Sequence, residues 1–195
     1  MTKAEGTRMM ILQTALKLIY RQGYQATSID EIIASTAVTK GAFFYHFKSK
    51  EQMGLAIINE ILYPGMVPYV KMAFSRTGNI RTDLYAMIED LLNNRKRFIV
   101  DYGCPAVNLI EEMAPISASF HKALLRIMDE WQSAIMKAVA QAQLEGQLDR
   151  SHDAKAIALY VIAGYAGARN MGKMFGVKAY SSFLKAFKNY VMSLE

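Results

Sequence analysis

Apolar residues recur at helical spacing along most of this chain. Leu12, Leu16 and Ile19 share one face of a first helix, which Gly23 is expected to end. No stretch shows sustained two-residue alternation with β-branched enrichment, so no strands are predicted. The expected helices are about Lys3–Gln22, Ser28–Ser35 and Lys40–Phe47, one that begins after Ser49, and then about Asn79–Tyr102, Pro105–Met113, Ser119–Leu144, Asp153–Lys173 and Lys178–Ser193.

This pattern predicts an all-α fold with two domains, residues 1–52 and residues 53–195. The helix that begins after Ser49 bridges the two domains. Pro64 and Pro68 follow in this helix and are expected to stop or kink it, because proline removes a backbone donor and clashes with the preceding turn.

Capping residues mark the start of three short N-terminal helices. Ser28-x-x-Glu31 matches a capping box, Thr39 is a second N-cap, and Ser49-x-x-Gln52 begins the bridging helix. Two short helices joined by a tight turn predict a helix-turn-helix, which places its second helix in the major groove of DNA.

Charge and aromatic residues support this interpretation. From Ala37 to Lys50 the chain carries three lysines and one histidine but no acid. Phe43 and Phe47 share a helical face and are expected to pack inward, which turns the three residues between them outward. The alternative is that the aromatic cluster is only core and the lysines only a solvated face. The capped helices and the acid-free stretch together favour DNA binding.

The residues that face outward can contact DNA in two ways. Lys40 can donate to guanine, Gly41 permits close approach to the bases, and Phe44 can touch a thymine methyl. Tyr45, His46 and Lys50 can donate to phosphate oxygens.

Residues 8–55 resemble the DNA-binding domain of the TetR/AcrR family of transcriptional regulators. The resemblance rests on Thr27-Ser-Ile-Asp-Glu-Ile-Ile-Ala and on Ala37-Val-Thr-Lys-Gly-Ala-Phe-Phe-Tyr-His-Phe-Lys-Ser-Lys-Glu51. It implies a homodimer on a palindromic operator in double-stranded DNA. The implied base contacts are Lys40, Gly41 and Phe44, and the implied phosphate contacts are Thr27, Ser28, Thr39, Tyr45, His46 and Lys50.

Two positions depart from the family pattern. The turn often carries glycine where Ala37 stands, so its backbone is expected to differ slightly. The recognition helix usually carries tyrosine where Phe44 stands. Phenylalanine lacks the hydroxyl, which removes one phosphate hydrogen bond worth about 1 kcal/mol.

The resemblance also implies that the helical C-terminal domain binds a ligand and forms the dimer. Small and aromatic residues of the last two helices suit a four-helix dimer interface: Ala163, Gly164, Gly167, Ala168, Phe183 and Phe187. Packing within one subunit is the alternative. The candidate pocket residues for a small, largely apolar effector are Met87, Leu91, Phe98, Tyr102, Cys104, Met113, Phe120, Met128 and Trp131. Each of them can instead be plain core.

Cys104 is the only cysteine, and it directly precedes Pro105. Proline favours the first position of a helix, so the thiol is expected at an N-cap, where the helix dipole favours a thiolate. Some TetR-like regulators with a similar Gly-Cys sequence sense electrophiles there. Electrophile or redox sensing through Cys104 is therefore an alternative to ligand sensing, and an inert buried thiol is the structural alternative to both. Glu111 and Glu112, on the helix that follows, are interpreted as surface.

Composition and motif content limit the classes of protein to which this chain can belong. Hydrophobic residues make up 52% and charged residues 21% of the 195 positions, which excludes disorder, and the formal charge of +6 fits a polyanionic partner. No metal-ligand spacing, phosphate loop or catalytic base partner for Cys104 is present, so neither an enzyme nor a cofactor is expected. The longest uncharged run is too short for a membrane span, and the charged start makes a poor signal peptide.

The sequence therefore predicts a cytoplasmic DNA-binding regulator, a repressor that an unknown small-molecule effector releases from its operator. An architectural DNA-binding protein without a ligand is the second candidate. Activation instead of repression stays open, because that sign depends on the position of the operator.

Overall fold

The structure is a computed structural model that describes residues 2–94 and 98–194. These residues form helices and connecting turns without a strand, which confirms the predicted all-α class. The chain divides into two compact units that interleave along the sequence. Unit 1 contains Met1–Pro64 and Pro105–Leu125, and unit 2 contains Gly65–Cys104 and Arg126–Glu195. This division reflects packing, and the functional boundary after residue 52 stays a prediction.

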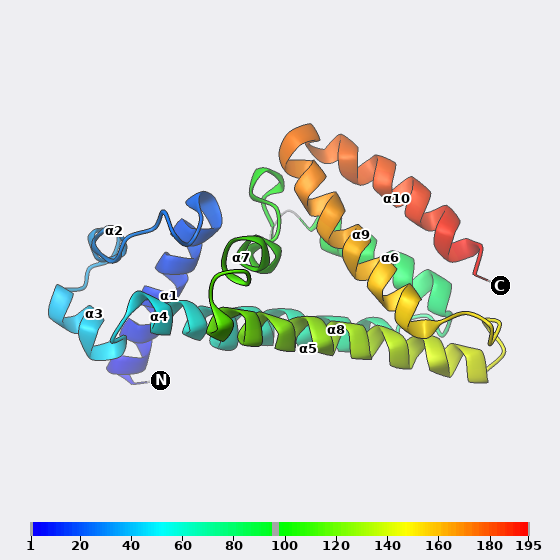
Figure 1. Cartoon of the computed structure of the whole chain (residues 1–195), viewed down its shortest axis with the longest axis horizontal. Helices are drawn as coiled ribbons and strands as arrows, with labels where there is room; N and C mark the ends of the chain where they lie inside the picture. Colours follow the sequence, from blue (N-terminus) through cyan, green and yellow to red (C-terminus); the bar gives the residue numbers. More distant parts are fainter. Residues whose placement is uncertain (1, 95–97, 195) are drawn as a thin grey trace. The chain divides into compact units, whose positions relative to one another are not determined.

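Unit 1 is built around a cluster of four N-terminal helices. In Figure 1, α2 and α3 lie next to each other, and α1 packs on both α2 and α4. Their bounds are α1 Lys3–Gln22, α2 Ile29–Ala34, α3 Lys40–His46 and α4 Lys50–Ile57. The predicted apolar face of α1 forms core through Leu12, Ala15 and Ile19, and Gly23 ends the helix with a φ of 93°. The helix α7 (Pro105–Met113) and the first turns of α8 (Ala118–Leu144) complete the unit.

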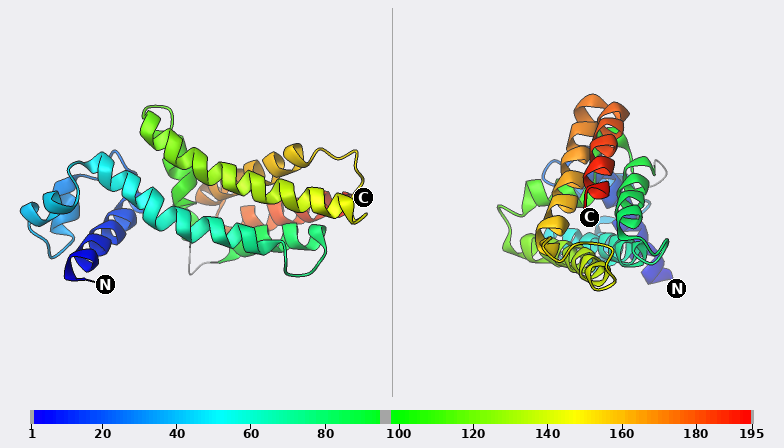
Figure 2. Two further views of the ribbon diagram at one scale, coloured as in Figure 1. Left: turned by 90° about the horizontal axis from the view of Figure 1, so that it is seen from below. Right: turned by 90° about the vertical axis from the view of Figure 1, so that its right-hand side faces the viewer.

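Unit 2 contains most of the long helices. Figure 2 shows α9 and α10 lying alongside each other, and α10 also packs on α6. The bounds are α5 Tyr63–Ala73, α6 Ile80–Asn93, α9 Ala154–Phe175 and α10 Val177–Met192, and the remainder of α8 belongs here too. No helix in the described ranges is both long enough and apolar enough to cross a membrane.

The prolines do not stop the bridging helix, so of the two expected effects only a kink stays a prediction. A short π-helical turn, Ile58–Leu62, directly follows α4 and leads into α5, which contains both Pro64 and Pro68. A π-helical turn shifts the hydrogen-bond register by one residue. This local change of register accompanies the prolines and lets the chain stay helical from Lys50 to Ala73.

The helix expected over residues 79–102 is shorter than predicted. It ends at Asn93, and a 3₁₀ turn covers Val100–Tyr102. Residues 95–97 of the predicted helix lie outside the described part of the chain. Phe98 and Tyr102 are four residues apart, which is the spacing of one helical face, and this spacing led to the longer prediction. Asn93 and Asn94 favour the end of the helix, because their side-chain amides compete for backbone hydrogen bonds.

Candidate nucleic-acid interface

Side-chain caps define the two helices of the predicted helix-turn-helix. The Ser28 hydroxyl accepts a hydrogen bond from the Glu31 amide at 3.1 Å, and the Thr39 hydroxyl accepts one from Ala42 at 3.2 Å. Both predicted N-caps are therefore confirmed. The reciprocal half of the Ser28 capping box is replaced, because the Glu31 carboxylate accepts instead from the Gln22 side chain at 2.8 and 2.9 Å.

The turn between α2 and α3 accommodates alanine without strain. Every described residue with a positive φ is a glycine, so Ala37 has an ordinary negative φ. Alanine in place of the glycine that is common in the family at this position therefore causes no backbone strain.

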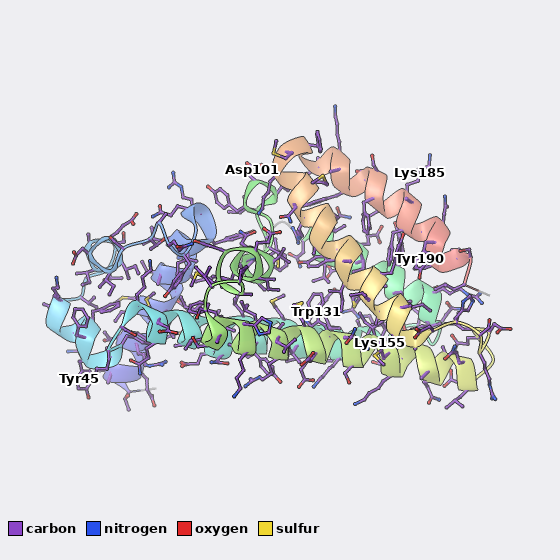
Figure 3. All side chains as sticks on the ribbon, viewed as in Figure 1. Tyr45, Asp101, Trp131, Lys155, Lys185 and Tyr190 are labelled. Atoms are coloured by element: carbon purple, nitrogen blue, oxygen red, sulfur yellow. The ribbon has the colours of Figure 1, made fainter. Side chains whose placement is uncertain are left out.

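The aromatic residues of α3 separate as their spacing predicts. Phe43 and the adjoining Phe47 are fully buried, with ring centroids 5.9 Å apart. Tyr45 is 73% exposed and lies on the outside of α3 in Figure 3. Phe44 and His46 are half-buried. The core therefore fixes α3 through one face and leaves the opposite face accessible.

The three candidate base contacts lie on the first turns of α3. Lys40 is exposed, and its ammonium lies 3.3 Å from the Asp30 carboxylate in an ion pair that is itself largely exposed. Such a pair is weak and can be exchanged for a DNA contact. Gly41 is also exposed, and the nearest atom to a Cβ added there is the Thr39 hydroxyl at 3.9 Å.

The candidate phosphate contacts differ in their accessibility. Ser28, Thr39 and Tyr45 are exposed, whereas His46 and Lys50 are half-buried. The side chain of Thr27 is fully buried, and its hydroxyl donates to the Gly23 carbonyl at 2.7 Å. This conformation does not present the Thr27 hydroxyl to a phosphate, so the side-chain contact implied for Thr27 is not retained.

Lys50 joins α4 to the loop between α1 and α2. Its ammonium donates to the Gln25 carbonyl at 3.1 Å and lies 4.5 Å from the centroid of the Tyr24 ring. Burial lowers the pKa of Lys50, and the nearby Glu112 carboxylate opposes this shift. An ammonium has three N–H donors, so this contact leaves Lys50 with donors for a phosphate.

Glu112 has a structural role, although its sequence pattern predicts only a surface position. Its carboxylate accepts hydrogen bonds from the backbone amides of Tyr24 and Gln25, at 2.8 and 2.7 Å. The helix α7 thus holds the loop that leads into α2. No sequence signal could indicate this contact, because the partners are more than 80 residues apart.

The candidate effector residues are divided between the two units. Met113 and Phe120 belong to unit 1, and the other seven belong to unit 2. Tyr102 and Met128 are half-buried, and the remaining candidates are buried: Met87, Leu91, Phe98, Cys104, Met113, Phe120 and Trp131. Phe120 packs on Tyr24, with ring centroids 4.8 Å apart, which is an ordinary core contact.

Cys104 is fully buried directly before α7. Its side chain neighbours the hydroxyl of Tyr165, a residue that is itself buried. The pKa of Tyr165 lies well above its ordinary value of 10, mainly because the hydroxyl is buried and secondly because the Cys104 side chain is close to it. This burial favours the structural alternative, an enclosed thiol, over a thiol exposed at a helix start.

The candidate dimer residues divide into a buried and an accessible set. Ala168 and Phe187 are buried within the chain, whereas Ala163 and Gly167 are exposed. Gly164 packs against the Phe183 ring, which a Cβ at Gly164 would approach to 2.9 Å. A groove of about 690 Å³ runs between the two helices and is lined by Gly164, Gly167, Ala168, Met171, Phe175, Lys178, Ala179, Ser182 and Phe183.

Comparison with known proteins agrees with this architecture. The family model described as "Bacterial regulatory proteins, tetR family" matches residues 11–57, and the model "Tetracyclin repressor-like, C-terminal domain" matches residues 81–187. The chain is 31% identical over 130 residues to an uncharacterized HTH-type transcriptional regulator of Lactococcus lactis subsp. lactis, covering 67% of this chain and 66% of that protein. It is 26% identical over 172 residues to the HTH-type transcriptional repressor DhaR of Mycobacterium sp. (strain GP1), covering 83% and 79%.

A solved structure is similar over nearly the whole chain. The regulatory protein TetR from Rhodobacter sphaeroides has a TM-score of 0.80 and 26% identity, with 93% of this chain and 96% of that chain covered. The two family models agree with the capped helix pair and with the exposed face of α3. One of these models spans more than half of the sequence. This chain belongs to the tetR family of bacterial regulatory proteins.

Proposed function

We propose that this protein is a transcriptional repressor that binds a palindromic operator as a homodimer and is released by a small, largely apolar effector. The single observation that carries the proposal is the exposed face of α3, held in place by the burial of Phe43 and Phe47. The relative DhaR, named as a repressor, supports the sign of regulation. A dimer of this type places its two copies of α3 about 34–36 Å apart, one turn of DNA.

In this proposal α3 specifies the sequence and its surroundings bind the backbone. Lys40, Gly41 and Phe44 face the bases. The phosphate contacts come from Ser28, Thr39, Tyr45, His46 and Lys50. Phosphate contacts give most of the affinity, whereas base contacts distinguish the operator from other DNA.

Two lysine substitutions test this division of roles. Lys50→Ala should weaken binding to all duplexes and lower the slope of log affinity against log salt by about one unit, because one phosphate contact is lost. Lys40→Ala should instead reduce the preference for operator over random DNA. Fluorescence anisotropy with labelled duplexes at several salt concentrations measures both effects.

A thermal unfolding curve for each variant provides the control, since Lys50 also contacts Gln25. If both folded variants gave the same profile across sequences and salt concentrations, the assignment of separate roles would be wrong.

We propose that the dimer forms through α9 and α10. Apolar side chains are exposed on these two helices, with Met174 76% and Phe175 67% exposed, next to the groove of about 690 Å³. A second copy of α9 and α10 would cover this surface and complete a four-helix interface.

Gly167→Glu tests the interface. No atom lies within 4 Å of a Cβ at Gly167, so the side chain fits the isolated chain but puts two buried charges into the dimer. We expect the dissociation constant of the dimer to rise at least about a hundredfold in sedimentation velocity. Ala140→Glu, at an exposed position on α8, is the matched control and should leave the dimer intact. A Gly167→Glu dimer as stable as the wild type would place the interface elsewhere.

The effector site and the cellular setting complete the proposal. The helical domain of residues 53–195 binds the effector, and the protein acts in the cytoplasm, on DNA, without catalysis. For regulation, the effector must bind the DNA-releasing conformation more tightly than the DNA-bound one. The alternative, electrophile or redox sensing through Cys104, requires a reagent to reach a thiol that is fully buried. We therefore adopt the ligand-driven mechanism.

Operator affinity measured with and without candidate effectors tests the proposal. Retained operator binding at saturating effector, with unchanged dimer geometry, would refute its regulatory half.

A further inference from the structure

Arg169 on α9 is a fully buried cation without an acidic partner in the described part of the chain. Its Nε donates to the Tyr165 hydroxyl at 3.3 Å and its Nη1 to the Tyr180 hydroxyl at 3.2 Å. Its Nη2 donates to the backbone carbonyl of Leu91. These bonds employ three of the five N–H groups of the guanidinium, and all of their acceptors are neutral.

Aromatic rings surround this guanidinium. Its Cζ lies 4.3 Å from the ring centroid of Phe98, 5.4 Å from that of Tyr180 and 5.5 Å from that of Tyr165. Such contacts attract a cation, but they do not neutralise it. Burying a charge without a counter-ion is strongly unfavourable. The surroundings of Arg169 therefore lack one negative charge.

Trp131 adds a second donor without an acceptor. The residue is 1% exposed, and its indole Nε1 is buried with no hydrogen-bond partner in the described structure. Figure 3 shows Trp131 on α8, on the side that faces α9, and its ring lies 5.6 Å from that of Tyr165. Buried indole N–H groups usually find an acceptor, so this one indicates a ligand atom that would supply it.

Tyr165 lies between these two donors. Its hydroxyl accepts a hydrogen bond from Nε of Arg169 at 3.3 Å, and a phenol, which is protonated at neutral pH, can also donate its own O–H. A guanidinium, an indole N–H and a phenol O–H thus contribute donors to one buried region of unit 2. Donors of this kind match a carboxylate, which offers only acceptors.

We propose that Arg169, Trp131 and Tyr165 bind the carboxylate of an organic acid, and that this acid is the effector. The inference rests on the proposed function and specifies its ligand. The buried apolar residues Leu91 and Phe98, which both contact Arg169, fit an apolar body attached to the carboxylate and do not fit a bare inorganic anion.

A surface groove shares the Phe98 side chain with this region. It measures about 370 Å³ and is lined by Phe98, Ile99, Val100, Asp101, Gly176 and Val177. Phe98 lines the groove and also stacks on Arg169, so a rotation of its ring would open the guanidinium to the groove. Asp101 is exposed, and water therefore screens its repulsion of an incoming anion.

The first test compares acids with their neutral amides on the full-length protein. Phenylacetate and octanoate are titrated against phenylacetamide and octanamide. The fluorescence of Trp131, the only tryptophan of the chain, reports binding at the site, and calorimetry confirms the affinity. We expect saturable binding of at least one acid, with its amide at least about tenfold weaker. Inorganic phosphate should bind more weakly than this acid, because it lacks an apolar body.

The second test changes the cation while keeping its charge. Arg169→Lys loses the planar fork and should weaken binding of the acid about tenfold. Arg81→Lys is the control, since Arg81 likewise donates hydrogen bonds to neutral acceptors, here the backbone carbonyls of Leu194 and Gln147, and lies outside the site. The control should bind the acid like the wild type. If Arg169→Lys does not fold, Trp131→Phe, followed by calorimetry, should show a several-fold loss.

Three results would overturn the proposal: equal affinity for acid and amide, no binding of either acid up to about 10 mM, or unchanged acid affinity in a folded Arg169→Lys protein. Operator affinity separates this proposal from the general one. Acid binding that leaves operator affinity unchanged supports the site but contradicts its role in regulation. Operator release by amides as strongly as by acids supports regulation and refutes the carboxylate site.

Discussion

Gly54→Ala is expected to destabilise unit 1 by about 3 kcal/mol, because a Cβ at this position of α4 has no room. It would lie 2.5 Å from Cζ of Phe120 and 2.8 Å from Cε2 of Tyr24, and both rings are buried. The rings cannot both yield, since they also pack on each other. Thermal denaturation should show the midpoint lowered by roughly 6–12 °C.

Gly41→Ala is the matched control for this prediction. The same methyl group on α3 meets nothing closer than 3.9 Å, so thermal stability should be unchanged or slightly higher, by up to about 1 kcal/mol. Operator affinity should nevertheless fall about tenfold, because the methyl group would separate α3 from the bases. Equal midpoints for the Gly54→Ala protein and the wild type would show that the Tyr24 and Phe120 rings adapt to the added methyl.

The second large effect is expected for Glu112→Ala. This change removes the acceptor of two charge-assisted hydrogen bonds from the amides of Tyr24 and Gln25 and should cost about 2 kcal/mol. The freed loop carries the Gln25 carbonyl that Lys50 contacts and leads into the cap of α2. Operator affinity should therefore fall together with stability.

Amide hydrogen exchange gives the most specific measurement. Exchange at Tyr24 and Gln25 should accelerate at least about tenfold in Glu112→Ala, and less in Glu112→Gln, which keeps an acceptor oxygen. Glu111→Ala, at the exposed neighbouring position, should leave both amides unchanged. Unaltered exchange at these two amides in Glu112→Ala would contradict the role assigned to this carboxylate.

Local signals in the sequence predicted most of the fold. The bounds of α1 and α7 agree with the prediction, and Ser28, Thr39 and Ser49 are the observed N-caps. Caps and apolar periodicity are properties of neighbouring residues, so a sequence reveals them directly. The inward placement of Phe43 and Phe47 follows from the same helical geometry.

Contacts between distant segments could not be predicted in this way. An arginine within an apolar helix, such as Arg169, gives no indication of whether a carboxylate, a carbonyl or a ring will face it, so its surroundings could not be predicted. The same holds for Glu112, whose partners come from the other end of unit 1 along the chain. The bridging helix shows a third limit of local prediction. Proline by itself tends to break a helix, but here a π-helical turn directly precedes α5, which contains both prolines, and the chain stays helical.

The interleaving of the two units has a consequence for biosynthesis. Glu112 and Phe120, which contact the loop and the ring of Tyr24, are synthesised 48 and 56 residues after Pro64, the last N-terminal residue of unit 1. The nascent N-terminal helices therefore lack these partners until translation has passed residue 120. The part of the chain that is made first thus reaches its native packing only after much of the remainder has been synthesised.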